Sequence, residues 1–392
     1  MTPTTDTDRA ERTGMRSGAS SASLAITDLR KDFGGTTAVD GISIDVPAGS
    51  FLVLLGPSGC GKTTTLRMLA GLENPTGGEI RFGDRVIARG DGTELVAPAE
   101  REAGLVFQSY ALWPHKTVRQ NIEWPLTVAK WSRADRRSRG DEVLSLLAIA
   151  ELADRYPGEI SGGQQQRVAI ARMIAPQPKV LLFDEPLSNL DARLRVETRG
   201  ELMRVHRSTG ATSVYVTHDQ VEAMTMATHI ALMKDGRIEQ FGTPRELLES
   251  PRTAFAATFI GTPPANIVEC RVHDGRLRAY GVDCGAAPST SVAADGDGDA
   301  DGVVRAMYRA SSLAASEEAT GPGVVAATFA DQVPMADRWV IGVDLPDGTR
   351  AHVSRDTPVG LLPGDGLGVR LPSEPDAYFD AAGERLDTGE NR

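Results

Sequence analysis

The glycine-rich segment GPSGCGKT at residues 56–63 constrains the fold more than any other part of the sequence. It follows the apolar run FLVLL at residues 51–55, which is typical of a strand covered on both faces. Residues 64–69 then predict a helix. The glycines let backbone N–H groups turn inward around phosphate oxygens, and the helix N-terminus adds partial positive charge. A strand, this loop and a helix in this order predict a phosphate-binding loop rather than an accidental glycine-rich turn.

Two side chains of this loop have predicted roles with ATP and its Mg²⁺. The ammonium of Lys62 is expected to reach the β- and γ-phosphates, and the hydroxyl of Thr63 is expected to bind Mg²⁺. The predicted nucleotide contacts are the loop residues and the one that follows: Gly56, Pro57, Ser58, Gly59, Cys60, Gly61, Lys62, Thr63 and Thr64.

The remaining periodicity predicts a mixed sheet with an inserted helical part. Apolar runs at residues 180–183 and 213–217 resemble the run at 51–55, and helical stretches separate them, as in a mostly parallel α/β sheet. Residues 24–29 and 42–46 alternate instead, which predicts half-exposed antiparallel strands. Residues 132–156 are rich in helix formers and predict a helical subdomain.

Two carboxylates follow the apolar run at residues 180–183. Parallel α/β sheets place ligands at the carboxyl ends of their strands, where Asp184 and Glu185 are expected to lie. We expect Asp184 to hold Mg²⁺ through water and Glu185 to orient and deprotonate the attacking water. The alternative, that both cap the next helix, is disfavoured by Pro186 directly after them.

A second candidate anion cradle is the segment ISGGQ at residues 160–164. Its predicted phosphate-facing residues are Ser161, Gly162, Gly163 and Gln164. By itself this segment can equally be a simple helix cap. Together with the loop and the carboxylates it resembles the LSGGQ signature of the ABC ATPase family, with Ile160 in place of leucine. The resemblance implies that this cradle closes on the γ-phosphate held by another subunit, in a head-to-tail homodimer or a dimer with a paralogous ATPase.

The resemblance extends to four further positions. Gln108 matches the family glutamine that senses Mg²⁺ and the attacking water, and Asp191 lies in a segment similar to the loop that communicates across the dimer. His218 matches the histidine that contacts the γ-phosphate. Phe33 is similar to the aromatic residue that stacks on adenine, although a place in the core remains an alternative for it.

The family resemblance implies a P-loop NTPase with a RecA-like core, an antiparallel β subdomain and a helical subdomain, followed by an all-β domain. Residues 1–22 are polar and are predicted to be a disordered tail. We expect the nucleotide-binding domain at 23–243, a hinge segment at 244–264 and the β domain at 265–392. Alternation at residues 339–345 supports this last assignment.

The C-terminal part resembles the OB/TOBE-like regulatory domain of carbohydrate importers of the maltose and glycerol-phosphate type. Residues 255–261 and 378–386 match segments of that group. Where those proteins usually have Arg-Pro-Glu, this chain has Tyr308-Arg309-Ala310, so a regulatory contact made there does not carry over. The acidic residues 293–301 lack the closing glutamate of a calcium loop and are expected to form a solvated loop.

The composition of the chain excludes some classes of partner and site. The net charge of −11 argues against general affinity for nucleic acid, and the three cysteines have no spacing typical of a disulfide framework or a zinc site. The sequence has neither an apparent secretory signal nor an apolar run of about 18 residues. We therefore expect a peripheral protein on the cytoplasmic face of the membrane, bound to permease subunits and served through them by an extracytoplasmic solute-binding protein.

The predicted function is ATP hydrolysis that drives solute uptake, with a carbohydrate as the expected cargo. Polyamine and ferric iron are the alternative cargoes. A soluble ABC ATPase that acts on nucleic acid is a rival, although such proteins usually carry two cassettes or a coiled-coil insertion. The C-terminal domain can also be an interaction module for a regulatory protein or a small ligand.

Overall fold

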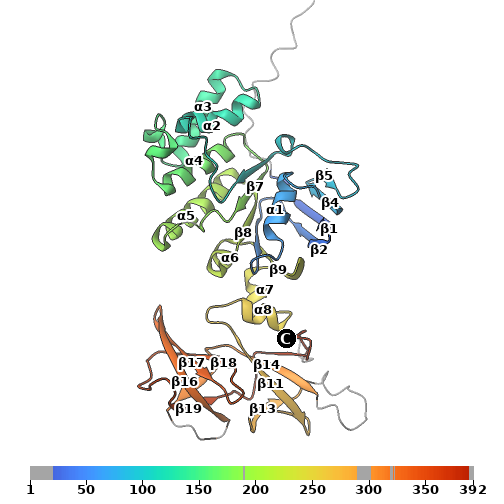
Figure 1. The fold of residues 1–392 in the computed structure, drawn as a ribbon, viewed down its shortest axis with the longest axis vertical. Coiled ribbons are helices and arrows are strands. Elements are labelled where there is room, and N and C mark those ends of the chain that lie inside the picture. Colours follow the sequence, from blue (N-terminus) through green and yellow to red (C-terminus); the bar gives the residue numbers. More distant parts are fainter. Residues whose placement is uncertain (1–20, 189, 289–301, 318–320, 322, 388–392) are drawn as a thin grey trace, which may run out of the picture. The chain divides into compact units, whose positions relative to one another are not determined.

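The computed structural model describes residues 21–188, 190–288, 302–317, 321 and 323–387 (Figure 1). The chain divides into two compact units, a first unit that ends at Ile238 and a second unit that begins at Glu239. The predicted disordered tail lies outside the described residues up to residue 20, as does the predicted acidic loop at 293–301. The domain boundaries predicted at residues 243 and 264 stay predictions.

A mostly parallel sheet forms the core of the first unit, as predicted. Its order is β10-β9-β3-β8-β7-β6, and the neighbours from β9 to β6 are parallel. Its strands are β3 (Phe51–Leu55), β6 (Ala103–Val106), β7 (Val180–Asp184), β8 (Thr212–Thr217), β9 (His229–Lys234) and β10 (Arg237–Gly242). Every residue of β3 and β8 is buried, so these strands need no polar alternation.

The strand order determines where the predicted site residues meet. Strands β3, β8 and β7 are direct neighbours, and Leu55 pairs with Thr217 while Asp184 pairs with Val216. Because the three strands are parallel, their carboxyl ends lie at the same edge of the sheet. The segments that follow these strands therefore converge there.

The antiparallel subdomain is also confirmed. Four strands have the order β2-β1-β4-β5, and all adjacent pairs are antiparallel. They are β1 (Leu24–Phe33), β2 (Thr36–Val46), β4 (Gly77–Phe82) and β5 (Arg85–Arg89). Burial alternates along the start of β1 and the end of β2, where one face is packed and the other is exposed.

The helices of the first unit differ in what they contact. Helices α2, α3 and α4 contact one another at one end of the unit, and α1, α4 and α6 contact strands of the sheet (Figure 1). The helices are α1 (Lys62–Ala70), α2 (Val118–Val128), α3 (Arg133–Leu146), α4 (Gly162–Ile174), α5 (Ala192–Thr209) and α6 (Gln220–Met226). The helical part predicted at 132–156 is thus confirmed, and Val143 and Leu144 of α3 are buried there as an apolar pair.

The second unit begins within β10, at Glu239, and has two short helices, α7 (Pro244–Glu249) and α8 (Ala254–Phe259). After α8 its described residues form strands and no further helix, which confirms an all-β C-terminal region. Two five-stranded sheets have the orders β13-β12-β11-β14-β20 and β15-β19-β16-β17-β18. The strands are β11 (Asn266–His273), β12 (Arg276–Ala279), β13 (Val282–Ala286), β14 (Val303–Tyr308), β15 (Ala314–Ser316), β16 (Val324–Met335), β17 (Arg338–Asp344), β18 (Arg350–Arg355), β19 (Gly366–Arg370) and β20 (Ala377–Phe379).

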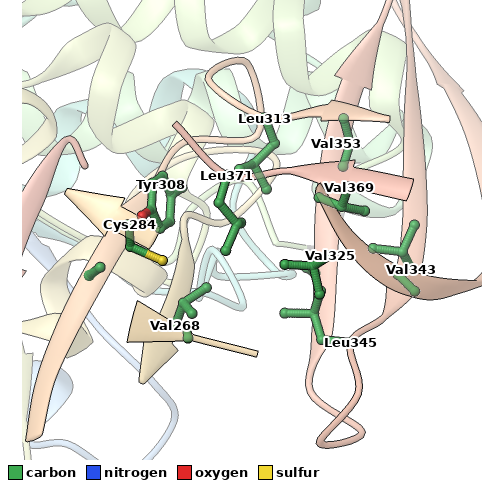
Figure 2. Close-up of a cluster of buried hydrophobic side chains, with 14 of the residues drawn as sticks. Val268, Cys284, Tyr308, Leu313, Val325, Val343, Leu345, Val353, Val369 and Leu371 are labelled. Carbon is green, nitrogen blue, oxygen red and sulfur yellow. The ribbon is translucent and has the colours of Figure 1, made fainter. Parts of the chain in front are cut away.

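One hydrophobic core joins these two sheets. Figure 2 shows Val268 and Tyr308 of the first sheet facing the same buried cluster as Val343 and Val369 of the second. Asn266 adds a polar link within the unit. Its Nδ2 donates to the carbonyl oxygens of Tyr308 at 3.2 Å and His352 at 2.9 Å, and its Oδ1 accepts from the N–H of His352 at 2.7 Å.

Asn266→Ala should destabilise the second unit by about 2–3 kcal/mol, because it leaves buried backbone groups of β14 and β18 without partners. Amide hydrogen exchange of the peptides that contain β11 and β18 measures this loss. Arg276→Ala breaks an exposed pair with Asp283 and should leave exchange in these strands unchanged. Equal exchange in Asn266→Ala and the wild type would contradict the role of this link.

Candidate functional site

The glycine-rich loop follows β3 and depends on two glycines. Gly56 has φ 152° and Gly61 has φ 98°, in the region that favours glycine. A Cβ atom at Gly56 would overlap the carbonyl oxygen of Met233, and one at Gly61 would overlap that of Ala38. Gly61 is also the N-cap of α1 and offers no side-chain cap, so the first amides of this helix remain available to an anion.

Lys62 places its charge inside this loop. The side chain is 5% exposed, and its ammonium donates to the carbonyl oxygens of Gly56 and Pro57, both at 2.7 Å. The sulfur of Cys60 lies 3.6 Å from the same nitrogen. A buried cation and the uncapped amides of α1 together make an electropositive site that fits a polyphosphate.

Thr63 and Asp184 meet although 121 residues separate them. The hydroxyl of Thr63 donates to Oδ1 of Asp184 at 3.1 Å. Burial raises the pKa of Asp184, whereas the hydrogen bond from Thr63 and the charge of Arg67 lower it. Hydroxyl and carboxylate oxygens are ligands that suit Mg²⁺, which usually takes few protein ligands and completes its shell with water and phosphate oxygens. The oxygens of Thr63 and Asp184 are thus two protein ligands of the kind that Mg²⁺ takes.

Glu185 and His218 lie beside this pair at the same sheet edge. Nδ1 of His218 is 3.5 Å from Oε1 of Glu185, and the imidazole is the more exposed of the two side chains. Glu185 has φ 43°, an uncommon value for a residue with a side chain. Its N–H donates to the carbonyl of Val216 at 3.2 Å, and its carbonyl accepts from the hydroxyl of Ser188 at 2.9 Å. These two hydrogen bonds fix the backbone of Glu185 at the end of β7.

Gln108 joins the same cluster from the loop after β6. Its Nε2 donates to the hydroxyl of Ser188 at 3.1 Å, and Ser188 in turn donates to the backbone of Glu185. The structure therefore brings together the predicted residues Thr63, Asp184, Glu185, His218 and Gln108, which come from four different segments of the sequence.

A buried network behind His218 was missed by the sequence analysis. The hydroxyls of Thr217 and Tyr215 donate to Oε2 of Glu222 at 2.6 and 2.9 Å. The N–H of Asp219 donates to the hydroxyl of Thr217 at 3.0 Å, which holds the turn that carries His218. Burial is the largest influence on Glu222 and raises its pKa, although both hydroxyl donors oppose this.

The signature segment begins α4, which contacts α2, α3 and strand β6. Ser161 is its N-cap: its hydroxyl accepts from the N–H of Gln164 at 3.4 Å, and the side-chain oxygen of Gln164 accepts from the N–H of Ser161 at 2.9 Å. Ser161 and Gly162 are exposed, while Gly163 packs near Leu194. The helix-cap interpretation is therefore correct as a local role, and the phosphate contact of this segment stays a prediction.

Two residues of α4 that the sequence analysis did not select form hydrogen bonds to the loops that carry Glu185 and Gln108. Gln166 donates from Nε2 to the carbonyl of Pro186 at 3.1 Å. Arg172 donates to the carbonyls of Tyr110 at 2.8 Å and Ala111 at 2.7 Å, and its guanidinium lies 4.7 Å from the Trp113 ring centroid. Burial lowers the pKa of Arg172. These contacts connect the signature helix to the Glu185 and Gln108 segments.

The structure shows the surroundings of Phe33 and Asp191, which exclude one alternative for Phe33 and give Asp191 a local structural role. Phe33 is 46% exposed at the end of β1, so the alternative that it is a core residue is wrong. The ammonium of Lys31 lies 4.7 Å from its ring centroid. Asp191 is the N-cap of α5 and accepts from the N–H of Leu194 at 2.9 Å. Adenine stacking and communication across a dimer stay predictions for these two residues.

Comparison with known proteins gives consistent matches. A model of the ABC transporter family matches residues 39–188. The trehalose/maltose import ATP-binding protein MalK of Thermococcus litoralis is 50% identical over 260 residues, which are 66% of this chain and 70% of that protein. The sn-glycerol-3-phosphate import ATP-binding protein UgpC 3 of Agrobacterium fabrum is 41% identical over 367 residues, 93% of this chain and 100% of that protein.

A solved structure matches the first part of the fold. It is the dimeric structure of a post-hydrolysis state of the ATP-binding cassette MJ0796 bound to ADP and Pi, with a TM-score of 0.50 and 32% identity. The match covers 57% of this chain and 99% of that one. With a relative matched over its whole length, and with the loop, the carboxylates and the signature helix arranged as described, this chain belongs to the ABC transporter family as one of its ATP-binding proteins.

Proposed function

We propose that this chain is the ATP-hydrolysing subunit of an ABC importer, which couples hydrolysis in a head-to-tail dimer to solute uptake through a separate permease. The observation that carries the proposal is the cluster at the ends of β3, β7 and β8. There, Thr63 contacts Asp184, His218 lies beside Glu185, and Gln108 is bonded to Ser188. Each group has the chemistry that phosphoryl transfer to water requires.

The glycine-rich loop would bind the phosphates of ATP. The amides at the start of α1 and the ammonium of Lys62 face the same small region, and ATP would replace the loop carbonyls that Lys62 now contacts. Thr63 and Asp184 are the residues that would hold Mg²⁺, with Gln108 as a further predicted ligand. Bound Mg²⁺ neutralises charge on phosphate oxygens. Phe33, exposed at the end of β1, would offer its ring to the adenine.

Hydrolysis would use Glu185 as the general base. Its carboxylate would accept a proton from a water molecule that attacks the γ-phosphate. His218, 3.5 Å from Oε1, would orient that carboxylate and contact the γ-phosphate. Gln108 would help to position the water from the opposite segment. The strained backbone of Glu185 and its bonds to Val216 and Ser188 fix the base before substrate binds.

The second cradle supports a shared site. Ser161 and Gly162 are exposed at the start of α4, which packs with α2, while α1 packs against the core strands (Figure 1). One chain thus carries two helix starts of the kind that binds anions, on separate elements. A head-to-tail dimer would use both for each ATP, and a related cassette with ADP and Pi was solved as a dimer. Gln164 and Asp191 would complete the contacts across this dimer.

Import is the direction that the relatives favour. Proteins named as import subunits for trehalose/maltose and for sn-glycerol 3-phosphate match this chain at 41–50% identity. We infer a carbohydrate or related polyol as the cargo. No helix among the described residues is long and apolar enough to cross a membrane. We place the chain at the cytoplasmic face of the membrane, where permease subunits receive solute from an extracytoplasmic binding protein.

The permease contact is proposed at the loop after β6 and at α2. From the sequence of residues 108 and 110–113 we expect a surface groove here that accepts a helix of the permease, but Tyr110 is only 8% exposed and contributes little surface to it. Phe107 and Trp124 supply exposed aromatic surface instead, and Trp113 packs edge to face against Trp124. Arg172 fixes this loop to α4, so a permease helix seated here would be mechanically connected to the signature segment.

Glu185→Gln should lower the ATPase rate by at least about 100-fold while ATP affinity changes less than about twofold, because the amide keeps the shape and loses the base. Single-turnover hydrolysis and fluorescent-nucleotide titration separate the two quantities. Glu102→Gln, at an exposed residue paired with Lys179, is the matched control and should be unaffected. Near-normal hydrolysis by Glu185→Gln would exclude Glu185 as the base.

Thr217→Val should lower kcat by about tenfold with little change in KM for ATP, because it releases the turn that carries His218 without touching the phosphate loop. Steady-state ATPase kinetics give this split. Thr225→Val in α6 is the control, since that hydroxyl bonds only to backbone carbonyls of its own helix. An unchanged kcat, or a KM that rises in proportion, would contradict a positioning role for this network.

A further inference from the structure

The second unit contains a pocket that the proposed function does not use. Its volume is about 490 Å³, within the range of sites for small ligands. One side of the pocket is formed by α7, α8 and the segment that joins α8 to β11. The other side is formed by the end of β14 and the loop after it, the start of β17 and the end of β18. Every lining residue belongs to the second unit, whereas every residue assigned to ATP lies before residue 219.

One wall of the pocket is apolar. It consists of Leu247, Leu248, Ala257, Ile260, Ala265 and Met307. Three hydroxyl groups, of Thr262, Ser311 and Ser354, lie on the rim and lining. Among the residues that the structure describes, none of these hydroxyls hydrogen-bonds to another protein group. The pocket thus combines a surface for a carbon skeleton with donors and acceptors for a hydroxylated ligand.

Arg309 supplies a fixed guanidinium. Its Nη1 lies 3.2 Å from Oδ1 of Asp376, and its Nη2 donates to the carbonyl of Leu248 at 2.9 Å. Oδ2 of the same aspartate accepts from the N–H of Arg309 at 2.7 Å and from the hydroxyl of Ser312 at 2.9 Å. A guanidinium carries five N–H groups, and these contacts use two of them. The remaining donors are held in place before any ligand arrives.

Arg338 supplies a second, more adaptable cation. It begins β17, is exposed, and lies 3.8 Å from the carboxylate of Asp356, which is itself 84% exposed. Such a long and exposed pair contributes little and yields readily to a better partner. No Asp or Glu lines the pocket, although the whole chain has a net charge of −11. The lining itself presents two guanidiniums and no carboxylate, and the aspartates that contact these arginines lie outside it.

From the two guanidiniums, the free hydroxyls and the apolar wall, we propose that this pocket binds a small hydroxylated phosphate ester. The phosphate would lie against Arg338 and Arg309, and the carbon skeleton against the apolar wall.

The test is isothermal titration of the full chain with sn-glycerol 3-phosphate. Saturating ADP is present throughout, so that the glycine-rich loop is occupied and cannot bind the ester. We expect binding that weakens at least tenfold in Arg338→Ala and in Ser311→Phe, which fills the pocket without changing its charge. Arg245→Ala, at an exposed arginine of α7 outside the pocket, is the matched control and should bind like the wild type.

Two companion ligands define the class. Glycerol should bind at least tenfold more weakly than the ester, because it lacks the phosphate, and inorganic phosphate should also bind more weakly, because it cannot reach the apolar wall. Equal affinity for inorganic phosphate would overturn the assignment of an ester. Full binding by Arg338→Ala and Ser311→Phe at unchanged melting temperature, or loss of all binding when ADP is added, would overturn the site itself.

Discussion

The parallel pairing of β8 with β3 on one side and β7 on the other is the constraint on which the rest of the site depends. It aligns Leu55 with Thr217 and Asp184 with Val216. Each strand continues at this edge into a segment with its own chemistry: the glycine-rich loop, the carboxylate Glu185 and the imidazole of His218. The apolar residues that bury β3 and β8 on both faces thus also set the spacing of the polar groups at their ends.

Helix α4 connects this edge of the sheet to helices α2 and α3. Gln166 bonds to Pro186 beside Glu185, and Arg172 bonds to two carbonyls of the loop that carries Gln108. The same helix begins at Ser161, the proposed contact to a partner's nucleotide. A movement of α4 would therefore act on the base, on Gln108 and on the aromatic surface near Trp113 together. These contacts connect the signature segment to the residues proposed for hydrolysis and to the surface proposed for the permease.

Much of this architecture follows from local sequence. Continuous apolar runs predict β3, β7 and β8, and a motif placed directly after such a run can only lie at the sheet edge. The contacts that support the site do not follow from sequence. They join residues that are distant in the chain, or they bury a polar residue where hydrophobic periodicity predicts an exposed one. In α6, Glu222 is buried while its neighbour Val221 is 52% exposed, opposite to what hydrophobic periodicity predicts. Arg172 bonds to backbone carbonyls, which leave no trace in residue types.

In the second unit, too, the class of fold can be predicted from sequence but the individual contacts cannot. Alternation predicts an all-β region, but no short-range pattern predicts that Asn266 would link β14 to β18, or that Arg309 and Arg338 would line one pocket. Arg309 follows β14 of one sheet and Arg338 begins β17 of the other, so these residues meet only because the two sheets pack together.

The central claim is that each ATP lies between the glycine-rich loop of one copy and the Ser161 segment of another. Mixing Lys62→Ala chains with Ser161→Arg chains tests it directly, because each homodimer lacks complete sites and each mixed dimer has one. The account predicts two inactive variants whose equal mixture recovers about a quarter of wild-type ATPase activity, since half of the dimers are mixed and one of two sites is intact. Ser132→Arg, at the similar N-cap of α3, should stay active alone. An inactive mixture, or an active Ser161→Arg homodimer, would contradict the shared site.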